Sequence, residues 1–209
     1  MKQIILVLAC IFAFSAANAQ KNSGGTVEFS FGSSQFTNYS AVSAFSDATP
    51  EYGKLLSLAF TGGYRFYNNI FIGGKLFREE GNTSAIFAHE SFENLGLMLD
   101  VRLYTPLSEK FEIEYGLVGG ALSHSNYMKD AADKKYALNR WGIYGYVAVG
   151  LRYNFTSVSY VGIKFNLPSY GLLLGDKPEI PASFTAISSA NEQDRFSNYS
   201  INFALGFRF

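Results

Sequence analysis

Apolar and polar residues alternate with a period of two in eight segments of the chain after residue 25. This period predicts β-strands with one apolar face, because successive side chains of a strand point to opposite faces. In the clearest segment, a leucine or valine stands at every second position from Leu95 to Leu103. Several segments are long enough to cross a lipid bilayer as tilted strands. The predicted strands are 26–34, 55–66, 70–78, 95–104, 111–122, 141–153, 158–167 and 198–209.

The connections between these segments alternate between long and short. The short ones are 67–69, 105–110 and 154–157, and the long polar ones are 35–54, 79–94, 123–140 and 168–197. Every second connection of an up-and-down barrel lies at the same end, so all short turns share one end. Outer-membrane barrels have this asymmetry, with short turns in the periplasm and long loops outside. The pattern predicts an all-β fold, an eight-stranded antiparallel up-and-down transmembrane β-barrel.

A soluble lipocalin-like barrel is the alternative, because it has the same strands but turns its apolar face inward around a ligand. Three features favour the transmembrane barrel. No Lys, Arg, Asp or Glu interrupts the apolar face of the predicted strands, and the chain ends with a phenylalanine inside the last strand. Aromatic residues also recur near the ends of that face, as in an interfacial girdle: Tyr64, Phe66, Phe111, Tyr153, Phe207 and Phe209 at the turn end, and Trp141 at the loop end.

Composition excludes several other classes of protein. The chain is 48% hydrophobic, 17% aromatic and only 16% charged, against about 25% charged in ordinary globular domains. Past the N-terminus it lacks the apolar run of about 20 residues that a membrane helix needs, and its aromatic content excludes disorder. The formal net charge of zero gives no attraction to nucleic acid, so we expect no nucleic-acid partner.

The first nineteen residues have the pattern of a secretory signal peptide. A basic start with Lys2 precedes an apolar stretch over 4–15, and the small residues of Ala17–Ala19 form a cleavage site. We therefore divide the chain into a signal peptide, 1–19, and an outer-membrane β-barrel domain, 20–209. Cleavage removes Cys10, the one cysteine, so no disulfide is expected in the mature chain.

The polar face of the predicted strands carries ten charged residues, six basic and four acidic: Glu28, Arg65, Lys75, Asp100, Arg102, Glu112, Glu114, Arg152, Lys164 and Arg208. Buried charges need partners, and the interior of an eight-stranded barrel is only just wide enough for its side chains. We therefore predict a packed polar lumen with an ion-pair network between neighbouring strands. The expected pairs are Glu28 with Arg65 and Arg208, Arg102 with Glu112, and Glu114 with Arg152 or Asp100. A narrow path for ions or small solutes is the alternative.

The two histidines are the candidates for catalysis. His89 lies in the second long connection, and His124 in Ser123–Asn126 at the start of the third. The latter segment resembles the lipid A deacylase family, but His124 and Ser125 are adjacent and would point to opposite faces of a strand. We interpret both histidines as surface-loop residues. We expect no catalytic residue, no metal and no cofactor.

The long connections remain the candidate for interaction with other molecules. Leu172–Leu174 in the fourth connection would either mark a contact surface, extend the hairpin of the preceding strand, or fold over the barrel mouth. We favour folding over the mouth. Nothing in the loops specifies a ligand or a surface partner.

The end of the chain resembles the C-terminal assembly signal of bacterial outer-membrane barrels. Asn202, Phe207 and Phe209 match its polar and aromatic positions, whereas Ala204 stands where glycine is usual. The mature chain as a whole resembles the small eight-stranded family of OmpA-type transmembrane domains and OmpX. The resemblance implies recognition by the outer-membrane barrel assembly machinery, contact with outer-membrane lipid, and residence in a Gram-negative outer membrane.

These features together predict a non-enzymatic, monomeric outer-membrane barrel that serves envelope structure or surface interaction through its extracellular loops. A porin-like channel for small solutes is the alternative function. A lipid A-modifying enzyme is the third.

Overall fold

The computed structural model describes residues 23–39, 54–67, 69–83, 90–129, 135–174 and 195–209. The predicted signal peptide over 1–19, His89 and most of the long connections lie outside these residues. Within the described part of the chain, no helix has the length and apolar content to cross a membrane.

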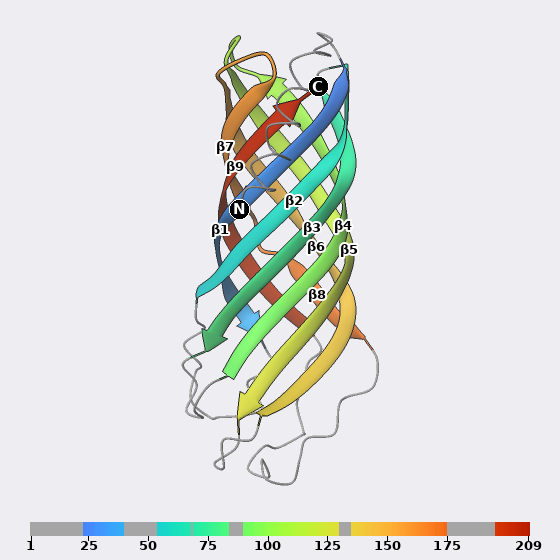
Figure 1. Cartoon of the computed structure of the whole chain (residues 1–209), viewed down its shortest axis with the longest axis vertical. Helices are drawn as coiled ribbons and strands as arrows, with labels where there is room; N and C mark the ends of the chain where they lie inside the picture. The colour runs from blue at the N-terminus through green and yellow to red at the C-terminus, as the bar shows by residue number, and fades with distance from the viewer. Residues whose placement is uncertain (1–22, 40–53, 68, 84–89, 130–134, 175–194) are drawn as a thin grey trace, which may run out of the picture.

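The described residues form a closed antiparallel β-barrel (Figure 1), as the alternation predicts. Each of the first six strands pairs with the next along the chain, the seventh and eighth strands each pair with the sixth and the ninth, and β1 pairs with β9 to close the sheet. Two short strands, β7 and β8, follow one another in the seventh position around the barrel, so the nine strands fill eight positions. The strands are β1 (Gly24–Tyr39), β2 (Lys54–Phe66), β3 (Ile70–Thr83), β4 (Glu90–Pro106), β5 (Phe111–Lys129), β6 (Lys135–Asn154), β7 (Ser159–Asn166), β8 (Tyr170–Leu174) and β9 (Arg195–Arg208).

Several strands run further toward the long connections than the sequence pattern indicates. The segment 123–140, expected as a loop, is mostly a hairpin, because β5 continues to Lys129 and β6 begins at Lys135. The alternation fades there because the outward positions become polar at Ser123 and Asn139. The backbone ladder continues regardless, since its hydrogen bonds do not depend on side-chain polarity.

The seventh position is interrupted between β7 and β8 at Pro168, which has no N–H to donate to a neighbouring strand. Beyond the break, β8 resumes the ladder and pairs with both β6 and β9. Leu173 points into the barrel and is 3% exposed. The expectation that Leu172–Leu174 fold over the mouth is therefore wrong, because the backbone groups of this segment extend the preceding strand.

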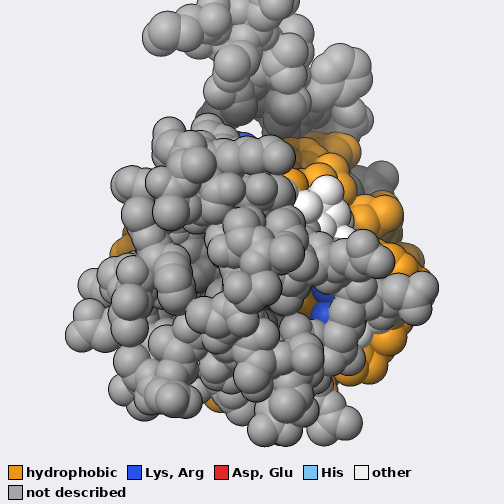
Figure 2. Space-filling model, turned by 90° about the horizontal axis from the view of Figure 1, so that it is seen from below, with side chains coloured by type: hydrophobic (Ala, Val, Ile, Leu, Met, Phe, Trp, Pro, Cys, Tyr) orange, Lys and Arg blue, Asp and Glu red, His pale blue; other side chains and the backbone are white. Residues whose placement is uncertain are grey.

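The outer wall is apolar, as expected from the phase of the alternation. Leu97 and Leu117 are among the most exposed large apolar side chains, at 62% and 64%. Figure 2 shows the barrel from the end of the long connections, where hydrophobic side chains gather on the visible outer wall. Such a continuous apolar exterior is stable in lipid, where closing the sheet also pairs every edge.

Candidate functional site: the barrel interior

All ten charged residues of the polar face lie in the strands that line the barrel interior. Nine of them are buried, and Arg208 at the turn end is half-buried. They point inward because each stands one position away from an outward apolar residue. All of them except Lys75 are linked by ion pairs in one cluster near the short turns, which we call the charged layer. Its residues are Glu28, Arg65, Asp100, Arg102, Glu112, Glu114, Arg152, Lys164 and Arg208.

Arg102 on β4 contacts three carboxylates of the charged layer. Its guanidinium donates to both carboxylate oxygens of Asp100, at 2.9 and 2.5 Å, and to Glu28 Oε2 at 2.8 Å. Glu114 Oε2 lies 3.8 Å from its Nη1. Asp100 and Arg102 are two residues apart on one strand, so they point inward side by side. Glu28 lies across the lumen on β1.

Glu28 and Glu114 are joined by two further cations. Lys164 Nζ lies 2.5 Å from Glu28 Oε1 and 2.9 Å from Glu114 Oε1. Arg152 Nη2 lies 3.1 Å from Glu114 Oε2. The Tyr160 hydroxyl also donates to Glu28 Oε2 at 3.0 Å. Each buried carboxylate thus has more than one donor, as burial of charge in a low dielectric requires.

Glu112 accepts hydrogen bonds from the two arginines of the charged layer that are nearest the turns, Arg65 and Arg208. Arg65 donates to both oxygens of the Glu112 carboxylate, at 2.9 and 3.1 Å. Arg208 Nη2 donates to Glu112 Oε2 at 3.2 Å. The guanidinium groups of Arg65 and Arg152 lie 4.0 and 4.4 Å from the centre of the Tyr104 ring, within the range of cation–π attraction.

The partners of Glu28 and Arg102 differ from the neighbour pairs expected from the sequence. The ion pairs of Glu28 run to Arg102, Lys164 and Arg152, on strands that do not adjoin β1. The strand register explains the difference, because Glu28 faces Thr61 on β2 and Gly206 on β9. Tilt and stagger of the strands offset residues that seem level in a list of segments. The Glu114–Arg152 pair does form, between adjacent strands.

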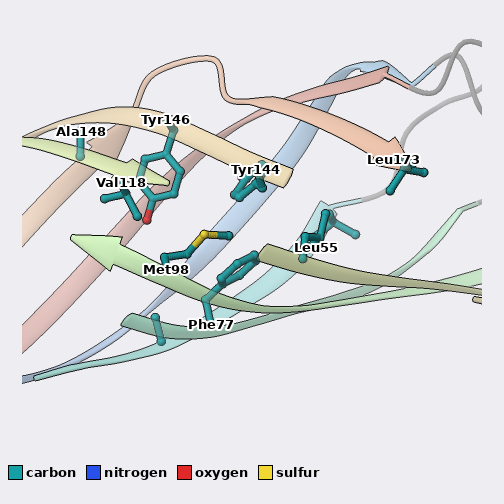
Figure 3. Packing of buried hydrophobic residues seen from close by; sticks show 10 residues of the cluster. Leu55, Phe77, Met98, Val118, Tyr144, Tyr146, Ala148 and Leu173 are labelled. Atoms are coloured by element: carbon teal, nitrogen blue, oxygen red, sulfur yellow. The ribbon is translucent and has the colours of Figure 1, made fainter. Parts of the chain in front are cut away.

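Lys75 lies on β3, and its Nζ donates to the Tyr146 hydroxyl at 2.5 Å. Beyond it toward the loop end, buried apolar side chains form a layer inside the barrel. Figure 3 shows Phe77, Met98 and Tyr144 pointing toward one another from facing walls. The layer consists of Leu55, Ala59, Phe77, Met98, Val118, Leu122, Tyr144, Tyr146, Ala148 and Leu173.

The sequence predicts a packed polar lumen with an ion-pair network, and this apolar layer is an addition that it does not predict. Phe77 and Tyr144 stack with ring centroids 5.4 Å apart. The Phe77 ring occupies the space over Gly96 on the neighbouring strand, where an added Cβ would lie 1.9 Å from a ring carbon. Only glycine leaves room for the ring at that position. The sequence alone does not reveal that Phe77 pairs with Gly96, and therefore does not reveal where the Phe77 ring lies.

A cluster of neutral polar groups and one carboxylate lies on the loop side of the apolar layer. His124 Nδ1 is 2.7 Å from Asn94 Oδ1, and Asn94 Nδ2 donates to Glu79 at 3.3 Å. Asn198 donates to Glu79 and to Ser34, at 3.2 and 2.9 Å. Sequence reasoning missed this cluster because it assigned Glu79 and His124 to loops. The inward phase of β3 and β5, continued past their predicted ends, identifies both.

His124 is therefore not a surface residue, as it is only 3% exposed. Its ring lies inside the barrel, whereas Ser123 and Ser125 are on the opposite face of β5. The extended backbone separates them, as the alternation requires. The described residues contain no cluster of His, Cys, Asp and Glu that could hold a metal ion.

The three residues of the proposed assembly signal lie in β9 and at its end. Asn202 points inward and donates to the Ser200 hydroxyl at 2.8 Å. Phe207 is 7% exposed and Phe209 39%. The Phe209 N–H donates to the Gly25 carbonyl at 3.0 Å, so the end of the chain is held by the β1–β9 closure.

A cavity of about 680 Å³ opens at the turn end of the barrel. Arg65, Glu112 and Arg208 line it, together with residues of the three short turns. It ends at the charged layer.

A closed antiparallel barrel with an apolar exterior and a charged, packed interior defines a transmembrane β-barrel of the small eight-stranded class. The chain matches the outer membrane protein beta-barrel domain over residues 4–209. It therefore belongs to that family and to the bacterial outer membrane. No curated protein matches it.

Several solved structures share its fold, and two of them illustrate the likeness. Neisserial surface protein A (NspA) is 11% identical, with a TM-score of 0.57 over 90% of this chain and 99% of that one. Ail, the attachment invasion locus protein of Yersinia pestis, is 11% identical, with a TM-score of 0.50 over 91% and 100% of the two chains. That Ail structure holds the heparin analogue sucrose octasulfate. At this identity, both likenesses show the fold alone.

Proposed function

We propose that this protein is a monomeric, non-conducting barrel that serves envelope structure or surface interaction through its long connections. The observation that carries the proposal is the filled lumen. The charged layer and the apolar layer lie one after the other along the barrel, so a solute would have to pass both. An ion crossing the apolar layer would lose its hydration, and the hydroxyls of Tyr144 and Tyr146 in this layer are already hydrogen-bonded to Asn198 and Lys75.

Solute uptake into liposomes tests the closed lumen. The purified barrel is reconstituted, and swelling is followed in an isotonic solution of a small neutral sugar. We expect no swelling above protein-free liposomes, while a general porin reconstituted in parallel gives rapid swelling. Swelling whose rate rises with the amount of this protein would contradict the proposal and favour the small-solute channel.

We also propose that the barrel is not an enzyme. A hydrolase of the Ser–His type needs the imidazole within hydrogen-bond reach of the nucleophile. His124 instead lies 2.7 Å from Asn94 inside the barrel, and the serines on either side of it face away. This arrangement supports a structural role for His124 rather than a lipid-modifying one.

We further propose that the short turns face the periplasm, that the long connections face outside, and that the assembly machinery recognises Asn202, Phe207 and Phe209. The lengths of the connections support this orientation, since outer-membrane barrels keep short turns on the periplasmic side. The aromatic positions at the end of β9 support recognition of the chain end.

Cysteine labelling in intact cells tests the orientation. Cys10 is the one cysteine of the chain and lies in the predicted signal peptide, so single-cysteine variants have no background. We expect a membrane-impermeant maleimide to label S43C in the 40–53 connection. It should label S157C, in the turn between β6 and β7, only after the outer membrane is permeabilised. The reverse pattern would overturn the orientation.

A further inference from the structure

The charged layer has a surplus of positive charge at its turn end. Its deeper part is balanced, with Glu28, Asp100 and Glu114 against Arg102, Arg152 and Lys164. Nearer the turns, Glu112 is shared by Arg65 and Arg208, and Arg152 Nη1 lies 3.8 Å from its Oε2. Among the side chains there, the guanidinium groups of Arg65 and Arg208 and the one carboxylate leave a surplus of one positive charge.

The geometry assigns this surplus to Arg208. Arg65 engages both oxygens of Glu112, whereas Arg208 reaches only Oε2, at 3.2 Å, which already accepts from Arg65. The other contact of its Nη2 is the neutral amide oxygen of Asn154, at 3.4 Å. The Nε of Arg208 is buried with no hydrogen-bond partner in the structure. Glu112 and Asn154 thus leave part of the hydrogen-bonding capacity of this guanidinium unused.

Arg208 also borders open space. It lines the cavity of about 680 Å³ at the turn end, and its side chain is 23% exposed. This volume lies within the range of small-molecule sites. The three turns around the cavity contribute neutral polar side chains, among them Asn69, Ser108 and Thr156. Lys110 and Glu109 at its rim are of opposite sign, so they do not cancel the surplus.

We propose that the turn-end cavity binds a small soluble oxyanion, a phosphate or carboxylate compound, through Arg208. The oxyanion supplies the charge and the acceptor atoms that Glu112 cannot give to two arginines at once. Arginine suits this role because its planar group forms paired hydrogen bonds with carboxylates and phosphates. Glu112 is then a built-in competitor that holds the arginines when no ligand is bound.

Calorimetric titration of the folded full chain in detergent tests the proposal, with pyrophosphate and citrate as the two probes. We expect saturable binding of at least one probe, and the stronger probe distinguishes phosphate from carboxylate chemistry. Arg208→Gln should weaken binding about tenfold. Glu112→Gln should strengthen it about fivefold, because it removes the competing charge. Arg78→Gln removes an arginine from the outer wall at the loop end and should leave the affinity unchanged.

The opposite effects of the two variants separate binding from a structural role. If Arg208 and Glu112 only stabilise the barrel, both substitutions lower stability and neither changes affinity. Folding is checked for each variant by heat-modifiable migration, and the Glu112→Gln titration decides if Arg208→Gln does not fold. Absence of saturable binding by both probes, or weaker binding by Glu112→Gln, would overturn the proposal.

Discussion

At the scale of single residues, the barrel interior is organised by arginines that each hold several carboxylates. Arg102 touches Asp100, Glu28 and Glu114, and its side chain is 5% exposed. Removing one partner of a buried pair leaves the other charge uncompensated, which costs more than the pair itself contributes. The charged layer is therefore expected to respond strongly to single substitutions and less to paired ones.

Arg102→Met should lower the free energy of unfolding by about 3–5 kcal/mol, because it leaves Asp100 and Glu28 short of a cation. The double variant Arg102→Met with Asp100→Asn should recover about half of that loss. Urea unfolding of the barrel in lipid vesicles measures both.

Arg78→Met is the matched control, since Arg78 pairs with Glu80 and Glu93 on the outer wall and its side chain is 51% exposed. Its loss should cost less than about 1 kcal/mol. Equal costs for Arg102→Met and Arg78→Met would show that the charged layer is not buried as the structure has it.

Which side chains point inward could be predicted from the sequence, but most of their partners could not. The side of Glu28 or Lys164 follows from local alternation, which every strand obeys. Whether Glu28 meets Arg102 or Arg65 depends on the stagger of strands around the closed barrel, and alternation does not reveal stagger. The apolar layer was missed for the same reason, since it depends on the pairing of Phe77 on β3 with Gly96 on the adjacent strand β4.

At the scale of the strands, the outer wall forms an apolar band bounded by polar positions. Leu99 on β4 lies within this band and is 58% exposed, while Leu107 in the turn after β4 is 59% exposed. The exposed fractions of the two side chains are nearly equal, but only Leu99 would contact hydrocarbon if the barrel spans a membrane.

Leu99→Arg should therefore lower the free energy of unfolding by about 2–4 kcal/mol in lipid vesicles, as a charge on the lipid face does near the midplane. Leu107→Arg should leave it nearly unchanged. Equal and small effects at both positions would contradict the membrane placement, because a soluble barrel exposes both residues to water.

The ends of the strands were the least predictable part of the fold. Apolar alternation reports where the wall meets lipid, and it stops near Ser123 although β5 continues to Lys129. The extension carries His124 into the interior and creates the Glu79 cluster. The hydrophobic alternation in the sequence therefore predicts the membrane-facing part of each strand better than it predicts where the strand ends.

At the scale of the whole molecule, the fold and the family agree on an outer-membrane barrel, and the interior argues for one that does not conduct. In the proposed function, the charged and apolar layers close the lumen in series, so opening one layer alone leaves the other. The turn-end cavity reaches the charged layer but does not cross it. In the function proposed above, the barrel is a scaffold for its long connections.

Single-channel recording tests the closed lumen most directly. The purified, folded barrel is inserted into a planar lipid bilayer in molar potassium chloride, and insertion is verified by heat-modifiable migration and by recovery from the bilayer-forming vesicles. We predict a flat current at all applied voltages, with no steps of constant size. Stable steps of uniform conductance that scale with the amount of inserted protein would contradict it.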